Sequence, residues 1–68
     1  MSLQREAQCT SYLREFRGGT WRVQAHVHLP DGQQTWVEGV HSEYELAHKA
    51  FWAHWKSQKQ GVYLRLPR

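Results

Sequence analysis

The chain has 68 residues and a mass of 8.1 kDa, with 40% hydrophobic residues, 22% charged residues and a formal net charge of +3. This size allows one domain with a thin core, and the apolar content excludes an intrinsically disordered chain. No apolar run reaches the roughly 18 residues of a membrane span, and the first residues lack a signal-peptide stretch. A single cysteine, Cys9, excludes an internal disulfide and favours a reducing compartment. We therefore expect one cytoplasmic domain over residues 1–68, with residues 1–8 flexible and no membrane association.

Two strands are predicted in the first half of the chain. Residues 10–16 are the first, although tyrosine, arginine and phenylalanine at every second position give it weak alternation. The turn-like residues 17–20 then lead into residues 21–29, which alternate strictly between apolar and polar types. A period of two is typical of a half-buried strand, so we expect these segments to form a hairpin.

A second hairpin is predicted around residues 29–33, Leu-Pro-Asp-Gly-Gln. Proline presets the first turn position and glycine supplies positive φ, so the return strand should cover residues 34–41. Pairing of Leu29 with Gln33 sets the register. The core-side pairs are then Val27–Thr35, Ala25–Val37 and Val23–Gly39. The open-side pairs are His28–Gln34, His26–Trp36, Gln24–Glu38 and Arg22–Val40.

The only long helical pattern follows this hairpin. Ser42 is the expected N-cap, in a capping box with Glu45, and the helix should end near Gln58. Helical spacing predicts two apolar stripes, one of Tyr44, Ala47, Phe51 and Trp55 and one of Leu46, Ala50 and Ala53. Trp52 falls beside the charged outer face. Residues 62–66 again alternate between apolar and polar types, and we expect them to form either a short closing strand or a docked extension. The predicted fold is α+β, an antiparallel meander of about three strands packed on one C-terminal helix.

The sequence gives little support for catalysis or metal binding. Its single aspartate, Asp31, is explained by the turn, and no nucleophile elbow or phosphate loop is present. A domain this small has little volume for a pocket, so we expect no enzyme, no cofactor and no small-molecule substrate. His26 and His28 have the spacing of a ligand pair, with Glu38 on the same face. The alternative is ordinary surface histidines, and we predict no metal site.

Nucleic acid is the first predicted partner. Residues 46–68 contain five Lys and Arg and no acidic residue, and the open sheet face offers side chains able to read base edges. The residues predicted to bind nucleic acid are Arg22, Gln24, His26, Trp36, Lys56 and Lys59. Helix-dipole complementation is the alternative explanation for Lys56 and Lys59, and a plain solvated surface is the alternative for the sheet face.

A protein partner, or a second copy of the chain, is the other predicted partner. Trp36 and Trp52 are both expected to be exposed, and exposed tryptophans often mark interfaces. The alternative is that one of them is covered by a terminal segment. The two hypotheses stay open at this point.

The chain also resembles a known type of DNA-binding domain. The residues that carry the resemblance are the strand beginning Gly19-Thr20-Trp21, the Asp31-Gly32 turn, Gly39 to Ser42, and a helix with Ala47 and Ala50. This order is similar to the small three-stranded-sheet-plus-helix domains, namely the arm-binding N-terminal domains of tyrosine integrases and the plant ethylene-response type. The resemblance implies that the sheet face away from the helix enters the major groove, with Arg22, Gln24, His26 and Trp36 at the DNA. Stand-alone modules of this kind are typical of bacterial or mobile-element accessory proteins.

Overall fold

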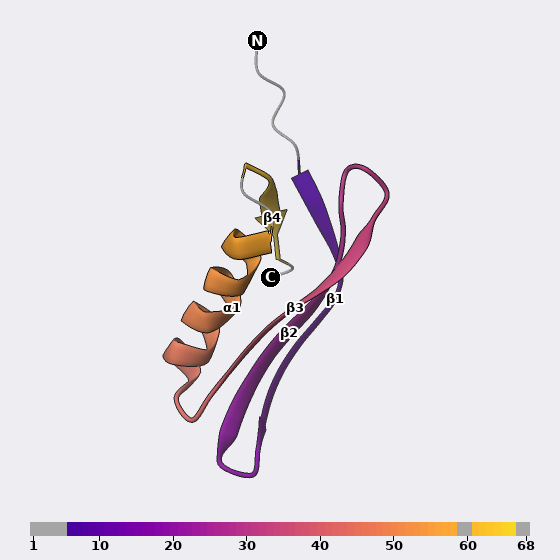
Figure 1. The fold of residues 1–68 in the computed structure, drawn as a ribbon. Coiled ribbons are helices and arrows are strands. Elements are labelled where there is room, and N and C mark those ends of the chain that lie inside the picture. Colours follow the sequence, from indigo (N-terminus) through magenta and orange to yellow (C-terminus); the bar gives the residue numbers. More distant parts are fainter. Residues whose placement is uncertain (1–5, 59–60, 67–68) are drawn as a thin grey trace.

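The computed structural model describes residues 6–58 and 61–66, which form four strands and one helix (Figure 1). The elements are β1 (Glu6–Arg17), β2 (Thr20–His28), β3 (Gln34–His41), α1 (Tyr44–Gln58) and β4 (Tyr63–Arg65). The sheet order is β3-β2-β1-β4, in which the first three strands of the chain form an antiparallel meander and β4 runs parallel to β1. The α+β fold with a meander and a C-terminal helix is therefore confirmed. The sheet differs from the prediction in being mixed and having four strands.

The β2–β3 hairpin has the predicted register throughout. The N–H of Leu29 donates to the carbonyl oxygen of Gln33 at 2.8 Å, and Gly32 has a φ of 92°. The strand pairs run from His28–Gln34 to Arg22–Val40, with His26 opposite Trp36 and Ala25 opposite Val37. Because a shift of one residue would exchange the two faces, this register fixes which side chains face the helix.

β1 is longer than predicted and contains a β-bulge. Its register against β2 shifts between Cys9 and Ser11, so that Thr10 has no direct partner. The extra residue changes the phase of alternation along the strand. Ala7 and Cys9 before the bulge and Tyr12 after it therefore all pack with the core.

The core lies between α1 and one face of the sheet. Its buried members are Ala7, Val23, Ala25, Val27, Leu29, Val37, Ala47, Phe51, Trp55 and Leu64. The helix backbone approaches β3 most closely at Gly39, where a Cβ atom would overlap the carbonyl oxygen of Ala47 and the backbone nitrogen of Phe51. Glycine is therefore required at this position for the helix to reach the sheet.

The start of the helix differs from the prediction. It begins at Tyr44, and the N–H of Glu43 donates to Nδ1 of His41 at 3.0 Å. The predicted capping box between Ser42 and Glu45 is not among the hydrogen bonds of the described part of the chain. His41 thus organises the entry into the helix.

The second predicted apolar stripe of the helix is also wrong. Leu46, Ala50 and Ala53 are exposed, whereas Trp52 is partly buried against the core. The indole of Trp52 offers a large apolar surface to the core, and burying it favours the rotation that turns Trp52 inward and leaves Leu46 and the two alanines exposed. The prediction that Trp52 is largely exposed is corrected accordingly.

The two ends of the described chain meet at the sheet edge. Residues 1–5 of the stretch expected to be flexible lie outside the described residues, and Glu6, Ala7 and Gln8 pair with β4. Ala7 and Leu64 are both buried there, so β4 extends the core beyond the meander. Within the described ranges, no helix has both the length and the apolarity needed to cross a membrane.

Candidate nucleic-acid interface on the open sheet face

The sheet face away from α1, called here the open face, carries most of the predicted site. Alternation along β2 and β3 brings four of the six predicted residues to it: Arg22, Gln24, His26 and Trp36. Arg22 and Gln24 face Val40 and Glu38 across the hairpin, and His26 faces Trp36. Strand geometry therefore places these four side chains on one continuous surface about two strands wide.

Trp36 is the largest side chain on this surface, and it is 53% exposed. Its indole lies against the ring of His26, with 4.6 Å between the ring centroids and 39° between the planes. The hydroxyl of the bulge residue Thr10 lies 2.9 Å from Nδ1 of His26 on the other side. The bulge thus supports the histidine, and the histidine supports one side of an indole that otherwise faces solvent.

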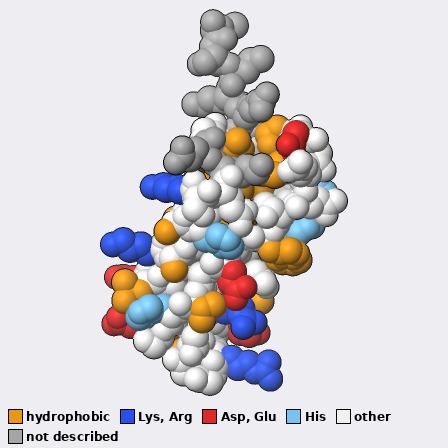
Figure 2. Space-filling view, viewed as in Figure 1, with side chains coloured by type: hydrophobic (Ala, Val, Ile, Leu, Met, Phe, Trp, Pro, Cys, Tyr) orange, Lys and Arg blue, Asp and Glu red, His pale blue; other side chains and the backbone are white. Residues whose placement is uncertain are grey.

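The charges of the open face are balanced. Nε of Arg22 lies 3.2 Å from a carboxylate oxygen of Glu38, in an ion pair whose side chains are 52% and 37% exposed. Over the three-stranded part of this face, Arg17 and Arg22 are matched by Glu15 and Glu38. The view in Figure 2 shows basic and acidic side chains interspersed over the visible surface. The open face is polar and aromatic, and it is not a basic patch.

The remaining predicted residues lie elsewhere. Lys56 is on α1, which packs against the opposite face of the sheet, and Lys59 lies outside the described residues. Trp52 is also on the helix, so it does not share a surface with Trp36. Sequence periodicity can assign side chains to the faces of one strand. It does not show whether residues of the helix lie on the same surface as residues of the sheet.

The sequence analysis assigned no role at the site to two exposed apolar residues of the open face. Leu13 pairs with Gln24 and is 41% exposed, and Val40 pairs with Arg22 and is 46% exposed. The predicted hairpin register had already placed Val40 there. Leu13 was not placed because the sequence analysis set no register for the first hairpin. Its pairing with Gln24 follows without a break from the Arg17–Thr20 pair at the turn, and the bulge lies beyond it.

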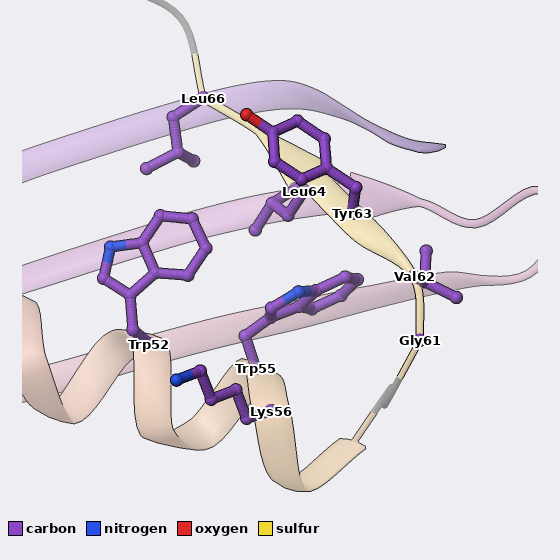
Figure 3. Close-up of a pocket in the computed structure, with 8 residues that line it drawn as sticks. All are labelled: Trp52, Trp55, Lys56, Gly61, Val62, Tyr63, Leu64 and Leu66. Atoms are coloured by element: carbon purple, nitrogen blue, oxygen red, sulfur yellow. The ribbon is translucent and has the colours of Figure 1, made fainter. Parts of the chain in front are cut away.

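A groove lies on the helix side of the sheet. It has a volume of about 750 Å³ and is formed between α1 and residues 61–66, with Trp52, Trp55, Lys56, Tyr63 and Leu66 among its lining (Figure 3). The small size of the domain had predicted little volume for a pocket. The groove exists because β4 pairs with β1 beside the helix, an arrangement that no local pattern indicates.

The histidine pair and the cysteine have structural explanations. The rings of His26 and His28 are 5.4 Å apart, and the described residues contain no group of three or more His, Cys, Asp or Glu side chains that could hold a metal ion. Sγ of Cys9 donates to the carbonyl oxygen of Ser11 at 3.2 Å, and burial raises the pKa of its thiol. A raised pKa lowers the thiolate fraction and makes Cys9 a poor nucleophile.

Comparisons of the chain with protein-family models, with curated proteins and with solved structures found no match.

Proposed function

We propose that the chain is a non-enzymatic module that binds DNA or RNA through its open face. The observation that supports this most is the exposed indole of Trp36 among polar side chains. An aromatic ring in this setting offers a stacking surface for a base, and such stacking contributes about 1–3 kcal/mol per base. The resemblance to sheet-plus-helix DNA-binding domains implies the same face.

The neighbours of Trp36 suit recognition of base edges. Gln24 and Gln34 carry amides that can donate to and accept from a base, and Arg22 can form two hydrogen bonds to guanine. The ion pair of Arg22 with Glu38 is exposed, and exposed pairs are worth about 0–1 kcal/mol. Arg22 can therefore exchange this carboxylate for a phosphate or a base at little cost.

The balanced charge of the open face predicts weak binding with a shallow salt dependence. Arg17 and Arg22 are the basic side chains of the meander on this face, so about two phosphates would be neutralised. The slope of log K against log salt should then be about −2. A strongly basic binding protein would give a much steeper slope.

Fluorescence anisotropy with labelled duplex DNA and single-stranded RNA, at about 50 and 200 mM salt, tests this proposal. Trp36→Ala should weaken binding at least about fivefold, from the loss of one stacked base. Arg22→Gln removes a positive charge from the open face and should also weaken binding. Lys56→Gln removes a positive charge from the helix layer instead. It is the matched control for Arg22→Gln and should bind close to wild type. The proposal fails if neither nucleic acid binds at the lower salt, or if Lys56→Gln weakens binding more than Arg22→Gln does.

A protein partner at the same face is the second candidate. Leu13, Trp36 and Val40 are 41%, 53% and 46% exposed there, and a balanced charge suits a protein surface as well. If the partner is a second copy, sedimentation equilibrium should detect a dimer that Trp36→Ala weakens. Trp52 is no longer a suitable anchor for this candidate, because it packs against the core.

A further inference from the structure

The groove between α1 and residues 61–66 has the volume and the lining of a ligand site. Trp55 and Leu64 are each only 3% exposed and form its floor, and Trp52 and Leu66 are partly buried beside them. Tyr63, at 59% exposed, stands at the rim. A ligand could therefore contact the walls and the rim without disturbing the core beneath. The volume of about 750 Å³ lies within the range of roughly 300–1,000 Å³ found for small-molecule sites.

Among the described residues, the lining is aromatic and aliphatic, and its one charge is the positive charge of Lys56. In Figure 3 the two indoles rise from the helix toward Leu64 and Leu66, and the amine of Lys56 lies on the same side as Trp52. Of the residues that the structure describes, no acidic one lines the groove, and Lys56 takes part in neither of the ion pairs found among them. Its charge is thus available to a ligand.

We propose that this groove binds a small aromatic anion, such as an aryl carboxylate. A flat ring can pack edge-on or offset against the indoles of Trp52 and Trp55, which is the arrangement that aromatic pairs prefer. The carboxylate then lies toward Lys56, where the ammonium group complements its charge. The site is separate from the open face, so it is independent of nucleic-acid binding.

A matched series of three ligands tests the proposal on the full chain. The ligands are 2-naphthoate, 2-naphthalenemethanol and 2-naphthylmethylamine, which share one ring system and differ in charge. Their binding is followed by nuclear magnetic resonance, through the indole and backbone N–H signals. For a fragment in an open groove, the dissociation constant of 2-naphthoate should be on the order of 1 mM. The alcohol should bind a few times more weakly and the amine most weakly of the three.

Two lysine variants separate the groove from the general charge of the helix. Lys56→Gln should weaken 2-naphthoate about threefold and leave the alcohol unchanged, which is the effect of one exposed charge pair. Lys49→Gln removes a charge from the same helix outside the groove and should leave both ligands unchanged. Saturable shifts confined to Trp52, Trp55, Tyr63 and Leu66 support the proposal. It is overturned if 2-naphthoate does not saturate these signals by about 10 mM, or if the amine binds as tightly as the anion.

Discussion

Nδ1 of His54 accepts a hydrogen bond from the backbone N–H of Glu38 at 3.1 Å, so a helix side chain occupies the free edge of β3. An edge strand leaves N–H and C=O groups available to another strand, and covering them prevents unwanted pairing. The side-chain amide of Gln58 contacts the second ring nitrogen of His54 at 2.6 Å and the hydroxyl of Thr35 at 2.9 Å. Polar contacts therefore join the C-terminal half of α1 to β3 in addition to the core.

Replacing His54 should loosen this edge. His54→Ala leaves the Glu38 N–H without its protein partner and is expected to lower the free energy of unfolding by about 1 kcal/mol. Asparagine can place its side-chain oxygen near the position of Nδ1, so His54→Asn should lower the free energy of unfolding by less. Urea unfolding measures the stability, and hydrogen exchange at the Glu38 amide measures the edge directly. Unchanged exchange at Glu38 in His54→Ala would contradict this role.

The hairpin could be predicted from the sequence because its determinants are local. The turn residues 29–33 fix the loop, and strict alternation in β2 fixes the two faces, so the exposed position of Trp36 followed. The candidate interface on β2 and β3 was predictable for the same reason. Four of its residues could be placed on the open face from the β2–β3 register alone.

Other features depend on contacts that are distant in the sequence. The bulge at Thr10 shifts the phase of β1. Ala7, Cys9 and Tyr12 therefore face the core without following one regular alternation in the sequence. The rotation of the helix depends on how much surface Trp52 buries against its neighbours, which a helical wheel does not weigh. The pairing of β4 with β1 is a parallel contact between the two ends of the chain, and it creates the groove. None of these follows from a short stretch of residues.

Gly39 should be the least replaceable residue of β3. In Gly39→Ala the new Cβ would overlap backbone atoms of Ala47 and Phe51, and backbone cannot move aside as a flexible side chain can. The helix would have to shift outward, at a cost of about 1–3 kcal/mol or more. Urea unfolding measures this loss. Val40→Ala, at the next and exposed position, is the control and should change stability by less than about 0.5 kcal/mol.

Truncation of two neighbouring residues of β3 should lower the stability by different amounts. Val37 is fully buried, and Val37→Ala should cost about 1–3 kcal/mol through lost burial and a cavity. Trp36→Ala removes only a cross-strand contact with His26 and should cost less than about 1 kcal/mol. Thermal and urea unfolding of the two variants measure the difference. A larger loss for Trp36→Ala would show that the indole is covered in solution.

Cys9 and Tyr12 should make the protein less stable in alkaline solution. Burial raises the pKa of the Cys9 thiol above its ordinary value of 9.0, and burial also raises the pKa of the Tyr12 hydroxyl above 10.0. Because the unfolded chain releases these protons at lower pH than the folded chain, the stability they contribute is complete below pH 9.0. It is lost as the pH rises through the folded pKa values. The free energy of unfolding, measured in urea from pH 7 to about pH 10.5, should therefore fall at the upper end.

The cysteine part of this dependence can be isolated. Cys9→Ala should flatten the fall that begins near pH 9.0, while Tyr12→Phe should affect the part above pH 10.0. The thiol should also react with iodoacetamide more slowly in the folded protein than in urea at the same pH, because the thiolate is the reactive form. Equal reaction rates in the folded and unfolded chain would show that Cys9 is accessible and that its pKa is not raised by burial.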